Sequence, residues 1–568
     1  FKQKTAYEIM PSLVGSEMCI RDRSNGKLVG TAILNNQVAL QVDEAGNSYL
    51  AWVGPEHKLY FARLNQQAEV LVEQSLNLTT KSPLKPQLLL DTTGQLHLFW
   101  LDKGERGLQV FYARLSADGE VLQEATAISP PDQRTSHSSV VLDAIGQTLE
   151  VFWSDKVYVR PGCYHAALDW SGTVIVPAEM LIPDGLLPVA QIDRQGFVHL
   201  AWRVEPEPEE PEFHYAVYNP QNRALGPEIL AAEPLIHMSL LGRPTAGASF
   251  DGPRLGLDES LVYLAWVLEM RERTEVQNLT FYQAFPQPAL GQRRSPETFS
   301  YSPPLVTSEP VPIRGVEPNM TGQPQFLRGQ PAYQVVAYFT QVPGLANVET
   351  LQIATAKVEP ERTIGQEIVN ASRSASVRPN IALDDEGNLH LVWIDTAGFE
   401  RYRVVYASTS PQAKATLNRI TAYDVMDKVF GGMMRVFSAL FFIPLVVNWL
   451  LIPVGWLVLF ALTTKETEIS DPRGPQALGV AMFLQLLSKL LIFPDLLNRP
   501  VLGSLSSPSL SIVMGRWVLP LLLAVVSAGA ALTYVKRSQS QSIFTTYFVY
   551  ATVDSLLTLI IYVAPRMA

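Results

Sequence analysis

The chain has 568 residues, too many for one ordinary core, so we expect at least two domains. Its charged fraction is 17% and its mean hydropathy is +0.10, which is unusually apolar for a wholly soluble protein. The formal net charge of −10 argues against nucleic acid as a partner, because a nucleic-acid-binding protein is expected to carry a basic face.

The opening stretch, FKQKTAYEIMPSLVGSEMCIRDR, has neither strand alternation nor a helical stripe. Read back into codons, KQKTAYEI and LVGSEMCIRDR correspond to a sequencing-library adapter, so we interpret residues 1–23 as translated adapter rather than native protein. Without its four basic and three acidic residues, the formal net charge moves from −10 to −11. Cys163 is then the one remaining cysteine, which excludes an intrachain disulfide and a cysteine-based metal or redox site. On this interpretation the lack of a signal peptide carries no information about export.

Residues 24–422 repeat a pattern of short strands. An Asp-x-x-Gly turn leads into an alternating strand that ends in Trp, as in LDTTGQLHLFW, and a third strand around Tyr-Ala, as in FYARL, follows most copies. A degenerate copy with Tyr338 in place of Trp brings the number of units to seven. The repeated residues are Trp52, Trp100, Trp153, Trp202, Trp266 and Trp393, with the turn glycines Gly46, Gly94, Gly146, Gly196 and Gly387.

Four short strands per unit, at intervals of 48 to 72 residues, predict an all-β, seven-bladed β-propeller. A single four-stranded blade has two faces to cover, and the next blade covers them, so we interpret the repeated Trp as an inter-blade packing residue. The repeated Gly is expected to supply positive φ in the turns.

Three histidines, His97, His199 and His390, occupy the same slot in different blades, where Tyr49 and Tyr263 also occur. We interpret them as equivalent strand positions rather than as a shared metal site. The sequence predicts no metal and no cofactor.

The repeat unit resembles the sialidase-like and NHL-like propellers, whose blades also carry Asp-x-x-Gly or Asp-x-Gly turns before a strand with an aromatic end. The resemblance covers about residues 35–420 and implies architecture. Sialidases also carry an Arg triad, a Tyr with a Glu partner, an acidic proton donor and Ser-x-Asp-x-Gly-x-Thr-Trp boxes, and that box and an Arg-Ile-Pro signature are missing from this sequence. Asp102, Asp155 and Asp395 follow the repeat Trp by two residues in three blades and are therefore interpreted as structural.

Two long connections interrupt the repeats. RVEPEPEEPEF is interpreted as a stiff, solvated hairpin extension, with a cation or basic-partner site as the alternative. The Pro-rich insertion at residues 287–325 is the longest connection, and long loops often carry specificity. Arg314, Glu317 and Asn319 are its candidate binding residues.

Residues 423–568 predict a transmembrane helical domain, because the apolar runs there approach the ~20 residues that a bilayer requires. The second run is the weakest, since it contains Lys489. The four predicted spans are 437–462, 476–493, 517–535 and 543–564.

Asp554 lies in the middle of the fourth span, and a lone charge at the bilayer centre costs about 2.5–3.5 kcal/mol on insertion scales. We expect Asp554 to mediate helix association or to pair with Lys489, with ion coupling as the more distant alternative. The lipid bilayer is thus a predicted partner, and partner membrane subunits remain open. The flanking Lys and Arg residues run mildly against a propeller outside the cell, yet we favour an extracytoplasmic propeller on a multi-pass cell-membrane protein.

Three functions are compatible with the sequence. The leading one is a non-enzymatic surface protein that binds or senses a glycan, a peptide or a protein. The alternative is a membrane-anchored glycoside hydrolase of sialidase-like type, which would need clustered carboxylates and arginines at one propeller face. The third is a transport or signalling component gated by the propeller.

Overall fold

The computed structural model describes two compact units, a propeller and a C-terminal group of helices. Residues 1–23, interpreted above as adapter, lie outside the described residues. The described residues are 26–34, 36–155, 161–207, 210–234, 248–271, 276–291, 299, 301–315, 320–343, 349–370, 372, 374–396, 402–418, 433, 437, 443–492, 514–538 and 541–563.

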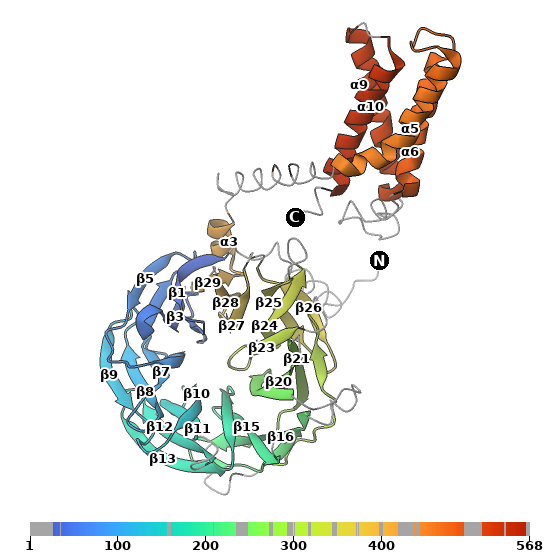
Figure 1. The fold of residues 1–568 in the computed structure, drawn as a ribbon. Helices are drawn as coiled ribbons and strands as arrows, with labels where there is room; N and C mark the ends of the chain where they lie inside the picture. The colour runs from blue at the N-terminus through green and yellow to red at the C-terminus, as the bar shows by residue number, and fades with distance from the viewer. Residues whose placement is uncertain are drawn as a thin grey trace, which may run out of the picture. The chain divides into compact units, whose positions relative to one another are not determined.

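The predicted seven-bladed propeller is confirmed: seven antiparallel sheets follow one another round a ring in chain order (Figure 1). In each of the first six sheets, the strands that lie side by side follow one another in the chain. Blades one to three consist of β2 (Ala39–Val42), β3 (Ser48–Val53), β4 (Leu59–Leu64) and β5 (Val70–Ser75); β6 (Leu84–Leu90), β7 (Leu96–Lys103), β8 (Leu108–Leu115) and β9 (Val121–Ala127); and β10 (Thr135–Asp143), β11 (Thr148–Asp155), β12 (Gly162–Asp169) and β13 (Val174–Pro183). A short 3-10 turn, η2 (Pro55–His57), connects β3 to β4.

Blades four to six continue the same order, and blade four has an extra strand, β18, that also pairs with β16. Their strands are β14 (Leu186–Ile192), β15 (Val198–Glu207), β16 (Glu210–Asn219), β17 (Ala224–Leu225) and β18 (Ile229–Ala232); β19 (Ala248–Leu257), β20 (Leu261–Arg271), β21 (Val276–Pro286) and β22 (Val311–Ile313); and β23 (Thr321–Phe326), β24 (Val335–Pro343), β25 (Glu349–Val358) and β26 (Thr363–Ile368).

The seventh blade closes the ring with a strand from each end of the propeller chain. It contains β27 (Ser376–Leu383), β28 (Leu389–Thr396) and β29 (Tyr402–Ser408), and its outermost strand is β1 (Lys27–Ala32). β1 pairs antiparallel with β29 and so covers the edge that β29 would otherwise expose. A short helix, α3 (Pro411–Leu417), follows, and its N-cap Ser410 accepts a hydrogen bond from the Ala413 N–H.

Aromatic residues fill the space between neighbouring blades. Trp100 packs with residues of blades one and two, and Trp153 with residues of blades two and three. In the blade that lacks the Trp, Tyr338 takes the same place against blade five. Each of the six repeat Trp side chains is almost fully buried. Five of them also stack on the residue directly opposite on the third strand, as Trp100 does on Phe111 at 5.9 Å.

The repeat Asp and the histidine slot form one hydrogen-bonded unit in three blades. His97 Nε2 lies 3.2 Å from an Asp91 carboxylate oxygen and His97 Nδ1 lies 2.9 Å from the Tyr112 hydroxyl. His199 and His390 make the same two contacts in their own blades. The turn Asp also accepts backbone N–H bonds, as Asp91 does from Gln95 at 2.9 Å. Each of these histidines therefore belongs to a separate blade and ties its turn to the third strand.

The expectation for Gly146 is wrong. Gly46, Gly94, Gly196 and Gly387 have positive φ, but in the third blade the positive φ of 53° falls on Gln147. Asp143 pairs with Thr148 across this turn, which is one residue longer than the turns of the neighbouring blades. The extra residue moves the left-handed position along the chain.

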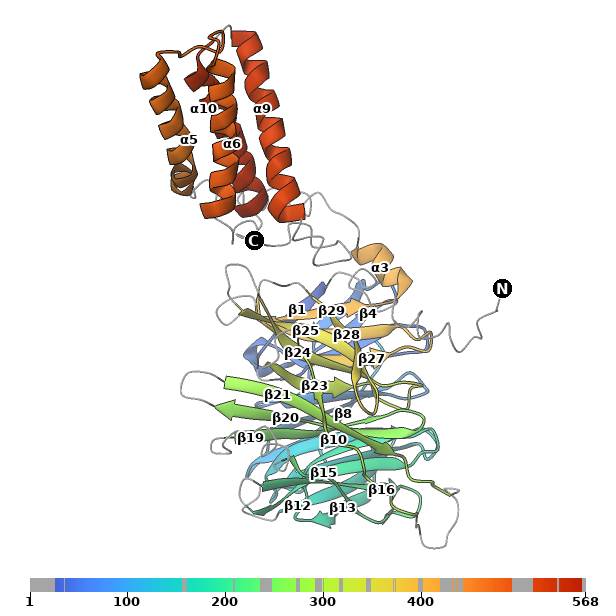
Figure 2. The same cartoon turned by 90° about the vertical axis from the view of Figure 1, so that its right-hand side faces the viewer.

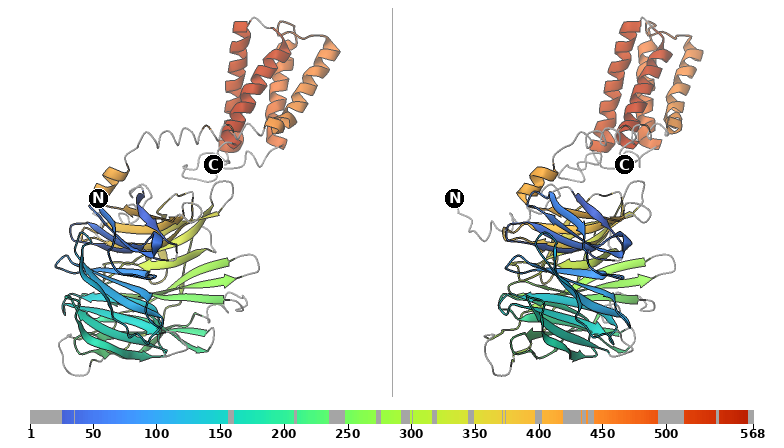
Figure 3. Two further views of the ribbon diagram at one scale, coloured as in Figure 1. Left: turned by 60° about the vertical axis from the view of Figure 1, so that its left-hand side comes forward. Right: turned by 90° about the vertical axis from the view of Figure 1, so that its left-hand side faces the viewer.

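The C-terminal unit contains four helices in the described residues, α5 (Ile443–Thr464), α6 (Gly474–Ile492), α9 (Leu519–Ser538) and α10 (Ile543–Thr558). Two π-helical turns adjoin them, η4 (Met514–Val518) before α9 and η5 (Leu559–Val563) after α10. α10 packs against the other three helices, as Figures 2 and 3 show.

Three helices are long and apolar enough to cross a membrane, over Val446–Thr464, Arg516–Ser538 and Ile543–Tyr562. Four spans were predicted, and α6, with Gln485 and Lys489, is not among the spans that the described residues support. The predicted start of the first span, at 437–442, lies almost wholly outside the described residues.

Replacing Trp100 by Ala should destabilise the propeller, because a large buried side chain leaves a cavity that costs about 3–5 kcal/mol. The measurement is the thermal melting of β-sheet circular dichroism in the full detergent-solubilised chain, with a clearly lower midpoint expected. Leu122→Ala is the matched control, since Leu122 lies in the same blade but is 47% exposed. Equal midpoints for the two variants would contradict the packing role of Trp100.

Candidate functional site

The first strands of the seven blades surround one cavity on the propeller axis. Its wall comes from β2, β6, β10, β14, β19, β23 and β27 or from segments directly beside them. The cavity has a volume of about 380 Å³, which falls within the ~300–1,000 Å³ typical of small-ligand sites. The axial cavity is therefore the first candidate for a binding site.

Five of the seven first strands contain an X-Pro dipeptide at a β-bulge. The dipeptides are Lys85-Pro86, Leu187-Pro188, Gly252-Pro253, Gln323-Pro324 and Arg378-Pro379. Lys85 has φ 50° and Arg378 φ 56°, although neither is Gly. A non-Gly residue in this left-handed region costs about 1–3 kcal/mol and persists only where the surrounding structure enforces it. Bulges redirect side chains, and here the side chains of both residues line the cavity.

Side-chain amides connect the first strands to one another around the axis. Each reaches a backbone carbonyl of a neighbouring blade, and together they link blades seven, one, two and three to one another and blade four to blade five. These bonds run from Gln37 Nε2 to Pro379 (3.1 Å), Gln41 Nε2 to Leu88 (2.7 Å), Gln87 Nε2 to Ser138 (2.9 Å), Gln191 Nε2 to Leu255 (3.3 Å) and Asn380 Nδ2 to Val38 (2.9 Å).

The described lining of the cavity carries an excess of positive charge. It contains four cationic side chains, Lys85, Arg254, Arg328 and Arg378, against one carboxylate, that of Asp251. The carboxylate is already engaged, since Arg254 Nη2 lies 3.2 Å from one of its oxygens. Lys85 Nζ and Arg328 Nη1 reach backbone carbonyl oxygens at 3.3 and 3.4 Å. Three cations thus lack a carboxylate partner among the described residues.

Most of this charge gathers around the X-Pro bulges. Lys85, Asp251, Arg254 and Arg378 all lie within two residues of a bulge Pro, whereas Arg328 lies beyond the end of β23. The charges influence one another: Arg254 lowers the pKa of the Asp251 carboxyl. The pKa of the Lys85 ammonium is lowered first by its enclosure within the protein and then by repulsion from Arg254. The Lys85 side chain is exposed to solvent in the cavity, and the surrounding protein still lowers its pKa.

The cavity offers charge and hydrogen bonds rather than a pair of free carboxylates. Paired carboxylates about 5–10 Å apart are the usual machinery of glycoside hydrolysis, while the described lining holds Asp251 alone, already bonded to Arg254. Fixed cations beside amide donors can bind a negatively charged group.

The three Asp residues that follow the repeat Trp bind the loops that lead into the first strands. Asp102 accepts bonds from the Lys81 and Ser82 backbone N–H groups, at 3.0 and 2.7 Å. Asp155 accepts from the Arg134 N–H at 2.8 Å. The Asp395 carboxylate accepts from the hydroxyls of Ser372 and Ser376, both at 2.8 Å. Their contacts fit the structural interpretation, and none of the three lines the axial cavity.

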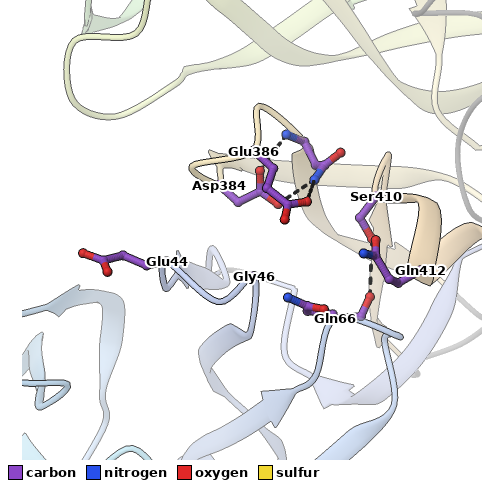
Figure 4. A pocket seen from close by; sticks show the side chains of 8 residues that line it. Glu44, Gly46, Gln66, Asp384, Glu386, Ser410 and Gln412 are labelled. Carbon is purple, nitrogen blue, oxygen red and sulfur yellow. Dashed lines mark hydrogen bonds between the residues drawn. The ribbon is translucent and has the colours of Figure 1, made fainter.

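A second hollow lies where blade one meets blade seven, but its volume of about 10 Å³ holds one water molecule at most. Asp384 there accepts two hydrogen bonds from Asn388, at 2.7 and 2.9 Å. Figure 4 shows Glu44 extending away from Asp384 and Glu386, so the three acids do not converge. The Ser410 hydroxyl donates to the Gln66 carbonyl across this hollow, which therefore serves ring closure.

Of the insertion chosen from the sequence, Gln325 at its C-terminal end lines the axial cavity, whereas the candidate Arg314 does not. Arg314 is exposed, and its backbone carbonyl accepts a bond from the Tyr338 hydroxyl at 3.1 Å. Glu317 and Asn319 lie outside the described residues. Tyr301 of the same insertion donates to the Pro227 carbonyl at 2.9 Å and so packs on blade four.

The cationic residues of the cavity were missed, although the sequence contains a signal for them. In four blades a Pro stands five residues before the repeat Asp, as Pro86 does before Asp91 and Pro379 before Asp384. Pro at a fixed offset within a predicted strand indicates a bulge. Residues beside such a Pro are candidates for the axial wall.

The two charges that the sequence singled out, Lys489 and Asp554, meet in the helical unit. The Lys489 ammonium on α6 forms an ion pair with the Asp554 carboxylate on α10, and both side chains are buried. Gln485 Nε2 donates to Asp554 at 2.5 Å, and the Tyr547 hydroxyl donates to Gln485 Oε1 at 2.6 Å. Lys489 also donates to the Thr558 hydroxyl at 2.9 Å. This network ties α6 to α10 and accounts for a Lys within an apolar bundle.

No protein-family model matches the sequence, and no curated protein matches it. Among solved structures, the chain is similar to the polysaccharide lyase Uly1, with 10% identity over 67% of this chain and 91% of that one and a TM-score of 0.43. It is also similar to an endo-arabinase from Bacteroides thetaiotaomicron, with 11% identity over 66% of this chain and 96% of that one and a TM-score of 0.29. It is similar as well to a Trypanosoma rangeli sialidase, with 8% identity over 70% of this chain and 61% of that one and a TM-score of 0.34. These similarities concern the propeller fold alone.

Replacing Asp554 by Asn should destabilise the helical unit, because it leaves the Lys489 ammonium buried without a counter-charge, at a cost of about 3–5 kcal/mol. Size-exclusion chromatography of the heated, detergent-solubilised chain should show a lower temperature of aggregation. The double variant Lys489→Met and Asp554→Leu is the control, since replacing both charges by apolar groups is close to neutral. An unchanged Asp554→Asn protein would contradict the pairing role.

Proposed function

We propose that this chain is a membrane-anchored binding protein whose propeller holds a glycan, peptide or protein ligand without turning it over. The observation that carries the proposal is the axial cavity of about 380 Å³, with its excess of cations and its side-chain amides. The site is concave, connected by hydrogen bonds and drawn from all seven blades, so a ligand would meet a wall already in place.

The membrane anchor is the second part of the proposal. Three helices have the length and composition to cross a bilayer, and the ion pair between Lys489 and Asp554 holds the bundle together. We place the propeller on the extracytoplasmic side of a cell membrane. Protease treatment of intact cells that carry an epitope in the propeller tests this orientation, because an epitope on the inner side would survive.

Binding without turnover is the expected outcome on glycan and peptide arrays probed with the full chain in lipid nanodiscs. The bound ligands are then incubated with the protein in solution, and mass spectrometry searches for cleaved products. We expect selective retention of a small set of ligands and no cleavage. Arg362→Gln, a change at an exposed turn that does not line the cavity, should bind like the native chain. New reducing ends or eliminated sugars would overturn the proposal in favour of a hydrolase or a lyase.

A further inference from the structure

We infer that the axial cavity is an oxyanion site: the group that enters it is a carboxylate, sulfate or phosphate on a hydroxylated small molecule or chain end, held by Lys85, Arg254 and Arg378. This inference rests on the proposed binding function and names the ligand chemistry of the same site. It concerns three residues from three different blades, on β6, β19 and β27.

The first support is the charge imbalance. Among the described residues, Lys85 Nζ bonds only to the Ser136 carbonyl and the Arg378 guanidinium has no carboxylate partner, while Asp251, the one acid in the described lining, is paired with Arg254. Lys85 is solvent-exposed and Arg378 partly exposed, so an anion placed among these cations would gain their combined attraction and charge-assisted hydrogen bonds. The chain as a whole is acidic, with a net charge of −10, so this local excess runs against its general composition.

The second support is the mutual proximity of the cations. Lys85 feels repulsion from both Arg254 and Arg378 and attraction to Asp251, and Arg378 feels Asp251 and Arg254. His137, on the first strand of blade three, lies within the field of Lys85, Arg254 and Asp251. All five groups line the same axial cavity, in keeping with this mutual influence. Enclosure lowers the pKa of His137 well below its ordinary value, so near neutral pH it is an uncharged hydrogen-bonding group.

The third support is how two of the cations are held. Lys85 and Arg378 stand at the strained, positive-φ positions before Pro, with φ of 50° and 56°. The Lys85 N–H donates to Asn36 Oδ1 and the Arg378 N–H to Gln323 Oε1, both at 2.7 Å, so side chains of the preceding blades brace both bulges. Strained backbone braced in this way is a frequent feature of binding sites. Leu187 and Gln323 show that the bulge itself does not require a cation, since they occupy the same position with similar φ.

The remaining wall indicates what accompanies the negative charge. Beside the cations it presents amides and hydroxyls, from Gln37, Gln41, Gln325, Ser138 and Ser139. Such groups bind hydroxyls through paired donors and acceptors. The volume of about 380 Å³ admits a compact group rather than an extended acidic peptide. A hydroxylated acid fits both properties of the wall.

The test uses the full chain in nanodiscs and isothermal titration with matched probes. Galacturonate is compared with galactose, which carries a hydroxymethyl group where the acid carries its carboxylate, and inorganic phosphate serves as a compact anion. Galacturonate should bind at least about tenfold more tightly than galactose, and phosphate should compete with it. Binding should weaken as salt rises, because added ions screen the attraction. An oligogalacturonate then separates the two sources: tighter binding than the monomer assigns the site to a chain end, and equal or weaker binding assigns it to a free small acid.

Lys85→Gln and Arg378→Gln should each weaken galacturonate binding about 10- to 100-fold, the loss expected for one charge-assisted hydrogen bond of about 1.5–3 kcal/mol. Arg362→Gln is the matched control and should leave it unchanged. Arg254 is left intact, since its removal would strand Asp251. Thermal melting of each variant identifies any variant that fails to fold. If a variant does fail, the comparison of galacturonate with galactose and the salt series, both on the native chain, still test the oxyanion inference.

Two failures are distinguishable. If the arrays yield a ligand that both Gln variants bind as tightly as the native chain does, and galactose equals galacturonate, the oxyanion inference falls while the binding function stands. If neither the arrays nor the three probes show any binding, the proposed function falls with it.

Discussion

Burial between neighbouring blades is the interaction on which the rest of this structure depends. A four-stranded sheet cannot cover its own two faces, so each blade is stable only against the next. The repeat Trp side chains fill these interfaces, and their loss of contact with water contributes ~25 cal/mol per Å² of apolar area. A chain of such units is complete only when its first and last blades also meet. The pairing of β1 with β29 provides that closure.

The axial cavity is a consequence of the same packing. Seven first strands cannot converge on one line, because each strand has its own width and side chains, and the space between them remains at the centre. Pro at the bulges fixes how the strands enter that space, and the amides of Gln87 and Asn380 bind blade two to blade three and blade seven to blade one. The rigidity needed for ring closure thus also holds Lys85 and Arg378 in place. A stable scaffold and an ordered binding wall have one physical origin here.

The sequence predicted the fold well because its determinants are local and repeated. The pair formed by Asp91 and Trp100 recurs at a spacing of 8 to 10 residues in other blades, so several weak signals add to one strong one. Predicting the site was harder. Arg254 and Lys85 stand 169 positions apart in the chain, and only the closed ring brings their strands to one axis. The insertion that contains Arg314 was chosen for its length and Pro content. In its described part, Tyr301 packs on blade four. The turn at Gly146 differed because one added residue shifts which position turns left-handed.

The contrast between an acidic chain and a cationic cavity has a physical consequence for recognition. At physiological salt the Debye length is about 8 Å, so distant surface charges contribute little to the field inside a channel. The walls of the cavity, by contrast, are protein of low polarisability, and they concentrate the field of Lys85, Arg254 and Arg378 within the enclosed space. An anion would gain little from long-range attraction to the protein and much from the last few ångströms of entry. Discrimination between charged and neutral ligands would therefore arise in the rate of escape rather than in the rate of encounter.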